Sequence, residues 1–502
     1  MISKTILALG TLCSAATANT GVHASLDIAI VEQAKDIYMD VILKAINNLA
    51  LPNIGDSKDY LHGNHVSVSQ NAQNVIFDVD VANNAVKLTC KDLSANFYSD
   101  SFRAHSWIFV AKGNLEVKMS TVGIGLGLSF TTQTLPDGRV MPAVDAVDVL
   151  VDIDRNDIDI KIWGNIWADF AAAFEIFFKS TVVGLIQDGV ETALSTTVPA
   201  VINAAFAGTD GMFAIPTENN WFLDWEMPIA AIVTETALEV GAKGIMFDEQ
   251  VGESEWSSAF VDMPYKDSTE TAGFQAYLSD LSVDSLMGSW LEVGDIAGWE
   301  YGDQLPEKFN TTITAGLLNT ALPGMTAKYG ADTIVDILGN CTALHSFASS
   351  AANQDVSVQG TVNLQFWPRL ADGSSELAVE FEMIDILFTG GIDVLNFNAT
   401  ANISTFLVDK VNVISSTIGN LSAFKLKVEF NTVSKLLVPS LNNFIQKYAF
   451  PIPQNILGIF TLNGLFLEYA DGYIFAGATP TFLPPTPTEV ESIAEPLHFE
   501  QF

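Results

Sequence analysis

Segments with helical spacing and segments with strand spacing alternate along the chain. Residues 26–49 carry apolar side chains every three or four positions, which predicts an amphipathic helix. From about residue 63 to residue 162 the period changes to two, which predicts a meander of long antiparallel strands with one buried face. A second long helical stretch follows at roughly 165–206, and Pro199 is expected to kink or divide it.

The second half repeats this order. Residues 274–291 and 313–338 are helix-like, and a further helix is expected from Lys435 to Tyr448. Period-two alternation predicts strands at 356–366, 377–383 and 424–430, with final strands around 459–479. Each half is therefore expected to be a curved antiparallel sheet with long amphipathic helices, in the α+β class.

The segments between these elements suggest the boundaries. Residues 238–247 are predicted to form one strand, and the acidic stretch after it is the candidate linker. The expected domains are 25–248 and 273–480, with a linker at 249–272 and a disordered, Pro-rich acidic tail at 481–502.

The N-terminus has the features of a secretory signal peptide. Residues 1–18 contain Lys4, an apolar stretch and an A-x-A cleavage site at Ala16–Ala18, with cleavage after residue 24 as the alternative. No later stretch is long and apolar enough to predict a transmembrane helix. The protein is expected to be secreted, or lumenal in the secretory pathway.

Composition adds an unusual combination. The chain has 23 Lys and Arg against 59 Asp and Glu, a formal net charge of −36. This argues against nucleic acid as a partner, since phosphate recognition needs clustered positive charge. Apolar residues are 49% and charged residues only 16%, which excludes a disordered chain and leaves more apolar side chains than an ordinary core requires.

Modification sites follow from the expected compartment. Cleavage leaves two cysteines, Cys90 and Cys341, and the sequence leaves open whether they pair. Five acceptor triplets for N-glycosylation lie in the second half, beginning at Asn310, Asn340, Asn398, Asn402 and Asn420.

Catalytic and metal-binding motifs are not supported. There is no G-x-S-x-G motif, and the glycines at 123, 125 and 127 belong to a strand pattern instead of a phosphate loop. The acidic run from Asp152 to Asp157 is explained by a turn between strands, and His62 and His65 by a surface loop. We expect no enzymatic activity, no catalytic residue, no metal and no cofactor.

The surplus of apolar side chains suggests a binding groove. A long helix laid along a twisted sheet can fill the interior or leave an apolar gap. Burial of a ~16-carbon acyl chain is worth about 12 kcal/mol at about 0.8 kcal/mol per CH₂ group, so such a gap suits a lipid. The alternative is an interior that is fully packed by the protein's own side chains.

Short motifs along the chain resemble the family of bactericidal/permeability-increasing protein, lipopolysaccharide-binding protein and the plasma lipid-transfer proteins. The matching segments are Leu51–Ile54, Leu238–Phe247, Ala276–Asp280 continuing to Trp290–Gly294, Val356–Gly360 through Phe366–Pro368, and Val438–Asn442 with Phe450–Pro453 and Phe475–Ala478. The resemblance implies an elongated two-domain boomerang, in which barrel-like domains are joined by a central sheet. Each domain would hold a phospholipid-like molecule between its long helices and its sheet.

The pocket residues implied by the resemblance lie on the expected helices. The first pocket would be lined by Ile28, Tyr38, Ile42, Ile46, Phe174, Phe177, Phe178, Val182 and Leu185. The second would be lined by Tyr277, Leu278, Leu437, Leu441, Phe444 and Ile445.

The implied function is that of a secreted lipid-binding or lipid-transfer protein, with lipids and transient membrane or lipid-particle surfaces as partners. The alternative is a secreted structural or host-defence protein with fully packed barrels and no lipid cargo. Two features depart from the family: no cysteine lies between Cys90 and Cys341 to form the disulfide of its first domain, and the first domain here is acidic. The acidity argues against electrostatic capture of lipopolysaccharide.

Overall fold

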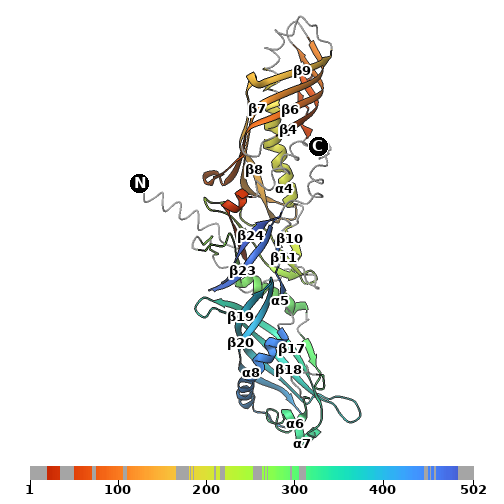
Figure 1. Ribbon diagram of the computed structural model, residues 1–502. Helices are drawn as coiled ribbons and strands as arrows, with labels where there is room; N and C mark the ends of the chain where they lie inside the picture. Colours follow the sequence, from red (N-terminus) through yellow and green to blue (C-terminus); the bar gives the residue numbers. More distant parts are fainter. Residues whose placement is uncertain are drawn as a thin grey trace, which may run out of the picture.

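The computed structural model describes most of the chain (Figure 1). The described residues are 20–33, 50–51, 53–69, 75–105, 110–164, 180, 183–184, 186–207, 211–214, 221–252, 263–264, 266–267, 270–293, 297–304, 312–445, 450–452, 454–456 and 460–483. The molecule is mostly β-sheet, with large sheets at its two ends and a further sheet between them.

A sheet built from residues 50–164 forms one end of the molecule. Its path is β2 (Ala50–Leu51), β4 (Tyr60–Ser69), β6 (Ala85–His105), β7 (Val110–Thr134) and β8 (Val140–Ile153). Three further strands pair with it, β3 (Ile54–Gly55) with β4, β5 (Val75–Asp80) with β6, and β9 (Ile158–Gly164) with β7. This first sheet curls around the helical segment that ends in α4 (Val198–Ala207).

A second large sheet forms the opposite end. Its order is β16 (Ala297–Glu300), β17 (Val335–Ser350), β18 (Asp355–Pro368), β19 (Val379–Leu395), β20 (Asn398–Ser416) and β21 (Phe450–Pro451). Its helices are α6 (Ala315–Leu318), α7 (Met325–Tyr329) and the long α8 (Ala423–Ile445).

The central sheet joins segments from both ends of the chain. Its order is β12 (Ile232–Val233), β13 (Ala237–Ala242), β1 (Val22–Asp27), β15 (Phe274–Ser279), β24 (Tyr473–Phe482), β23 (Phe460–Ala470) and β22 (Asn455–Ile456). A small sheet of β10 (Met212–Ala214), β11 (Trp221–Asp224) and β14 (Met246–Asp248) lies beside it, together with α5 (Asp280–Val293).

Asparagine side chains attach a helix to each large sheet. The Asn203 amide of α4 donates to the carbonyl oxygen of Val144 on β8 at 3.0 Å and accepts from its N–H at 2.7 Å. The Asn431 amide of α8 does the same with Val408 of β20, at 2.9 and 2.7 Å. Each amide completes the hydrogen bonds of a strand residue as a neighbouring strand would, which fixes the helix on the sheet.

The period-two patterns are confirmed as strands over most of 63–162 and over 356–366 and 379–383. The expected fold is confirmed at the coarse level of curled antiparallel sheets with helices against them. His62 and His65 lie on β4 and not in a loop, although both are exposed as expected.

The two long helices predicted in the first half have different bounds in the structure. Residues 26–27 belong to β1, and the helix described there covers 28–33, because the chain first completes the central sheet. The described part of the second helix starts at residue 180, passes through a π-helical turn at Ala193–Thr197, and continues as α4 with Pro199 at its start. The helical run is unbroken from the π-helical turn through Pro199, so the helix is not divided there, and the predicted kink stays a prediction.

Two further predictions were wrong because a sharp turn or a change of period was missed. Residues 238–247 form parts of β13 and β14 in different sheets, separated by a turn at Gly244 with φ +71°. Residues 274–279 form β15 instead of the start of a helix, and α5 begins at Asp280. In β15 the even alternation of buried and half-buried residues reflects a strand between two partners.

The helix predicted at 313–338 was also wrong. Only α6 and α7 are helical there, and β17 begins at Val335, because Pro323-Gly324 and Gly330 interrupt the helix. The strand predicted at 424–430 is the first part of α8. Leu426 and Phe430, four residues apart, pack against the core of the second sheet, which is a helical relationship.

The structure describes parts of the predicted tail (481–502) and of the predicted linker (249–272). Residues 481–482 of the predicted disordered tail pair with β23 as the end of β24, and residues 484–502 lie outside the described residues. The described part of the predicted linker includes Pro264, whose carbonyl oxygen lies 2.7 Å from Nδ1 of His23 in β1. The domain boundaries themselves stay a prediction. No helix among the described residues is long and apolar enough to cross a membrane.

Candidate functional site

The concave face of the first sheet is the candidate site. Residues paired directly across antiparallel strands point to the same face, so the register identifies this face row by row. One row runs from Phe77 of β5 through Leu88 of β6 to Leu126 of β7. The next row is Val79, Val86 and Leu128. All of these side chains are apolar, as the period-two pattern predicted.

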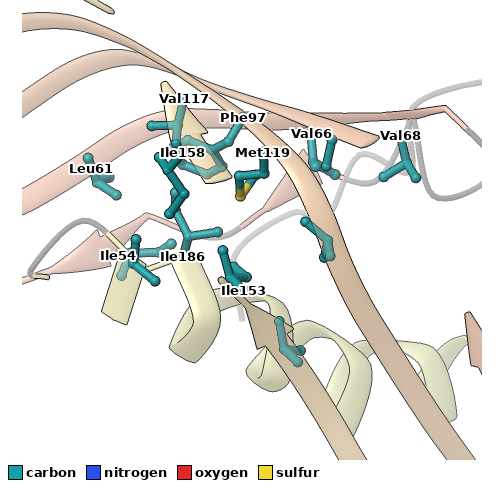
Figure 2. Close-up of a cluster of buried hydrophobic side chains, with 14 of the residues drawn as sticks. Ile54, Leu61, Val66, Val68, Phe97, Val117, Met119, Ile153, Ile158 and Ile186 are labelled. Carbon is teal, nitrogen blue, oxygen red and sulfur yellow. The ribbon is translucent and has the colours of Figure 1, made fainter. Parts of the chain in front are cut away.

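One part of this face is completely packed. Figure 2 shows Ile186 reaching from the helical segment toward Ile158, beside Phe97 and Val117 of the sheet. These four side chains are buried, as are Leu61 and Leu115 in the same cluster. Here the helix fills the concavity, and a ligand would have to displace protein side chains.

The rest of the same face is only half covered. Cys90, Ile124, Leu126 and Val149 pack at the margin of the buried cluster but keep partial exposure. The half-buried apolar side chains of this zone are Phe77, Val79, Val86, Leu88, Cys90, Ile124, Leu126, Leu128 and Val149. We call these residues the half-covered zone. It is a continuous apolar area across β5–β8, of the kind that an apolar ligand would cover.

Glycines on the opposite, convex face let the strands approach closely at this zone. A Cβ atom on Gly127 would lie 2.7 Å from the carbonyl oxygen of Val147 and 2.8 Å from its Cγ2 atom. Gly125 and Gly127 lie within β7, so their predicted assignment to a strand is confirmed. The glycines therefore shape the sheet behind the half-covered zone and form no loop for a phosphate.

The second sheet has a similar concave face. Leu364 lies opposite Phe381 of β19, which lies opposite Val413 of β20. Phe381 is fully buried, and Leu426 of α8 closes the cluster over it. Toward β17 the covering is again incomplete, and the half-buried side chains there are Ile337, Cys341, Val362 and Leu364.

Few of the predicted pocket residues can be placed. Of the first set, Ile28 is half-buried just after β1, while Tyr38, Ile42, Ile46, Phe174, Phe177, Phe178, Val182 and Leu185 lie outside the described residues. Leu437, Leu441, Phe444 and Ile445 lie on α8. Tyr277 and Leu278 lie on β15 of the central sheet, so they are not on a helix as predicted. Their role in lipid binding stays a prediction.

The predicted pocket residues lie on the expected helices, and the strand residues of the half-covered zone were not predicted. Their alternation was visible in the sequence, for example Phe77 and Val79 between Ile76, Asp78 and Asp80. The partial exposure of the inward-facing residues was not visible, because it depends on tertiary packing, which the alternation does not record.

The candidate modification and metal sites are distributed as follows. Cys90 and Cys341 are free thiols on different sheets, and burial raises the pKa of both. Asn340, Asn398, Asn402 and Asn420 are exposed, and Asn310 lies outside the described residues. In the described ranges no group of three or more His, Cys, Asp or Glu side chains could hold a metal. Asp154 caps a turn at Arg155–Asp157, as expected of the acidic run.

The central sheet carries a buried polar pair that is separate from these apolar faces. His23 of β1 and Glu239 of β13 are 5% and 3% exposed, and Nε2 of His23 lies 3.4 Å from Oε2 of Glu239. Burial raises the pKa of Glu239 to about 7, although the Lys266 N–H opposes this shift by donating to the carboxylate. Burial also lowers the pKa of His23, against the effect of its hydrogen bond to Pro264. Both shifts favour the neutral forms.

Comparison with known proteins gives structural likenesses to solved chains. No protein-family model and no curated protein matches the chain. A crystal structure of lipopolysaccharide binding protein is similar with 16% identity and a TM-score of 0.45, over 92% of this chain and 99% of that chain. Takeout 1 from Epiphyas postvittana is similar with 15% identity and a TM-score of 0.27, over 36% of this chain and 91% of that chain. Because both TM-scores lie below 0.5, the function has to be inferred from the site itself.

Proposed function

We propose that this chain is a secreted lipid-binding or lipid-transfer protein that holds phospholipid-like acyl chains against the concave faces of its two large sheets. The observation that carries this proposal is the half-covered zone, where inward-facing apolar side chains such as Leu88 and Leu126 stay partly exposed. The protein performs no covalent chemistry in this role. The bound lipid takes the place of a cofactor.

The energetics favour an apolar occupant. Each methylene group that moves from water to such a surface contributes about 0.8 kcal/mol, so an acyl chain of ~16 carbons lying along the zone would bind strongly. The half-buried side chains would gain burial at the same time. The packed cluster around Phe97 and Ile186 would bound the lipid at one end, because its side chains already fill that part of the interior.

The charge of the protein narrows the ligand class. With a net charge of −36, the chain would repel strongly anionic head groups and bare anionic membranes at long range. A zwitterionic or neutral acyl lipid fits better than lipopolysaccharide. Nucleic acid is disfavoured for the same reason.

The finer arrangement follows the family resemblance. The two large sheets would be the two domains of a boomerang, at 25–248 and 273–480, joined through the central sheet. The predicted helices 26–49 and 165–206 would cover the first concave face, with Phe174, Phe177 and Phe178 facing the lipid. Residues 437–445 of α8 would do so in the second domain.

Native mass spectrometry of the secreted protein, before and after delipidation, tests the proposal. We expect a mass excess that disappears on extraction with organic solvent and a lipid of defined class in the extract. A protein that is free of lipid and also fails to take up a fluorescent phosphatidylcholine would refute it.

A pair of matched variants tests the location. Leu126 lies on the concave face and Leu150 on the convex face of the same region, where Leu150 is exposed. Leu126→Trp should block uptake of the fluorescent lipid by filling the half-covered zone, whereas Leu150→Trp should leave uptake unchanged. Equal uptake by both variants would mean that the lipid does not bind at the half-covered zone.

The alternative function is a structural or host-defence protein whose interior is fully packed. The cluster in Figure 2 favours this alternative for its own part of the sheet. The partial exposure of the neighbouring rows favours lipid binding for the rest.

A further inference from the structure

The convex face of the second sheet carries a cluster of exposed aromatic rings. Trp299 of β16 and Tyr301, just beyond the end of β16, are 45% and 46% exposed, and their rings are stacked with centroids 6.4 Å apart. Trp367 of β18 adds a third ring, 6.0 Å from that of Trp299. Large aromatic rings with their faces in water are a common feature of binding surfaces. We call these three residues the aromatic platform.

The register places the platform on the side away from the core. Trp299 lies opposite Leu338, which lies opposite Gln365, two residues before Trp367. Ile337 and Phe366, the intervening residues, point to the concave face and contact the buried cluster there. The platform is therefore separate from the proposed lipid site.

Ion pairs hold the platform in place. Arg369 donates to both carboxylate oxygens of Asp303 and of Asp336, at 2.6–2.8 Å. Asp336 also accepts from the N–H of Gly302, next to Tyr301, at 3.0 Å. These contacts fix the turn after β16, so the rings are ordered before any ligand arrives.

Planar polar side chains adjoin the rings. Oε1 of Gln365 accepts from the indole N–H of Trp367 at 3.2 Å. Glu380 accepts from the amides of Gln365 and Asn363, at 3.0 and 3.1 Å. Aromatic faces next to amide and carboxylate groups suit a sugar, whose C–H groups pack on rings while its hydroxyls exchange hydrogen bonds.

A sugar attachment point lies on this same face. Asn340 is exposed, begins the triplet Asn340-Cys341-Thr342, and pairs with Ala297 of β16 on one side and Asn363 of β18 on the other. Trp299 is two residues from Ala297, so Asn340 and Trp299 are diagonal neighbours, about 7–8 Å apart and within reach of long side chains.

We propose that Asn340 carries an N-linked glycan and that the first sugars of this glycan lie on the aromatic platform. In the modification, the Asn340 amide nitrogen forms a bond to the anomeric carbon of an oligosaccharide held on a polyprenyl diphosphate. The bond from that carbon to the diphosphate oxygen breaks, the diphosphate leaves, and the amide nitrogen loses one proton. Transfer precedes folding, because Asn340 lies in a strand with partners on both sides. The glycan then shields Trp299 and Tyr301 from water.

The first measurement is the occupancy of the triplets in protein secreted from a eukaryotic host. Mass spectrometry of glycopeptides should show a glycan on Asn340. Thr342→Ser keeps the acceptor triplet and should keep the glycan, while Asn340→Gln should lose it. An unmodified Asn340 overturns the proposal, and glycans on Asn398 or Asn420 in the same sample would show that the site, not the secretory route, is at fault.

The second measurement tests the contact. Hydroxyl-radical oxidation of Trp299 and Tyr301 should rise about twofold when the glycan is absent, since the glycan covers one of the two faces of each ring. Wild-type protein and the Thr342→Ser variant should be protected, and Asn340→Gln should not. Asn420→Gln is the matched control and should leave both rings protected. Equal oxidation with and without the Asn340 glycan overturns the proposal.

The outcome is separable from that of the lipid proposal. Uptake of fluorescent phosphatidylcholine by Asn340→Gln should equal that of the wild type, because the platform lies on a convex face and the proposed lipid sites lie on the concave faces. A glycosylated wild type that takes up no lipid would refute the lipid proposal and leave the glycan proposal standing.

Discussion

His23 and Glu239 meet inside the central sheet, with Nε2 of the imidazole 3.4 Å from Oε2 of the carboxyl group and both side chains buried. Nδ1 of His23 is 2.7 Å from the carbonyl oxygen of Pro264, so this nitrogen carries the proton and Nε2 is an acceptor. A protonated Glu239 can then donate to Nε2. Lys266, whose backbone N–H donates to Glu239, also forms an ion pair with Asp27, with Nζ 2.8 Å from Oδ2.

This arrangement predicts how stability depends on pH. The pKa of Glu239 rises from 4.5 to about 7 on folding, so its contribution to stability is present below about pH 4.5 and is lost as the pH rises through 7. Glu239→Gln, which mimics the protonated form, should be more stable than the wild type at about pH 8, by up to about 3 kcal/mol, and equal to it near pH 4.

Urea unfolding of both proteins at several pH values measures this difference. His23 acts in the opposite direction, because its lowered pKa removes stability as the pH falls below 6.5, so the two proteins must be compared at each pH. Glu235→Gln, an exposed position close by, is the control and should change nothing. A constant difference between wild type and Glu239→Gln at all pH values would contradict the predicted titration.

Truncating a side chain should destabilise the protein more in the packed core than in the half-covered zone. Phe97 is fully buried in the packed cluster, so Phe97→Ala should cost about 3–5 kcal/mol of unfolding free energy. Leu126 lies in the half-covered zone, and Leu126→Ala should cost less than about 2 kcal/mol because the truncated side chain was already partly in water. Thermal or urea unfolding of delipidated protein provides the comparison, and equal losses would mean that the zone is packed as tightly as the core.

The turn at Gly244 should not tolerate a side chain. Its φ is +71°, and a Cβ atom there would lie 2.7 Å from Cγ2 and 2.8 Å from the backbone nitrogen of Val22. Gly244→Ala should therefore cost both the left-handed strain of about 1–2 kcal/mol and a steric term of about 1–3 kcal/mol. Gly252→Ala, with φ +74° and no atom within 4 Å of its Cβ, carries only the strain. Urea midpoints that shift equally would show that Val22 moves aside at no cost.

The asparagine that attaches α8 to the second sheet needs its amide. Asn431→Asp keeps the shape and can accept from the Val408 N–H but cannot donate to the Val408 carbonyl oxygen, which is buried. We expect a loss of about 1–3 kcal/mol at neutral pH. Asn412→Asp, at an exposed position on the same strand, should have no measurable effect in the same unfolding experiment. A loss at Asn412 as large as that at Asn431 would point to net charge as the cause.

The sequence was most informative where one face of a strand is buried and the other is in water. The alternation of Ile124, Leu126 and Leu128 with glycine, and of Val362, Leu364 and Phe366 with polar residues, correctly identified strands and their inward faces. The alternation pattern gave the wrong element at 424–430. Lys and Glu alternate there with apolar residues, which fits a strand of period two and the exposed first turns of a helix equally well. The contact of Phe430 with Phe381, and the hydrogen bonds of the next residue, Asn431, with Val408, select the helix.

The sequence by itself determined the class of fold, the curled antiparallel sheets and the apolar character of their concave faces, because these depend on periodicities within a few residues. Only the tertiary structure decided which strands share a sheet. The central sheet joins β1, β13, β15 and β24, and the contact of His23 with Pro264 spans 241 residues. It also decided which inward-facing side chains are packed and which stay half covered. That distinction depends on where a helix crosses the sheet, which no local pattern records.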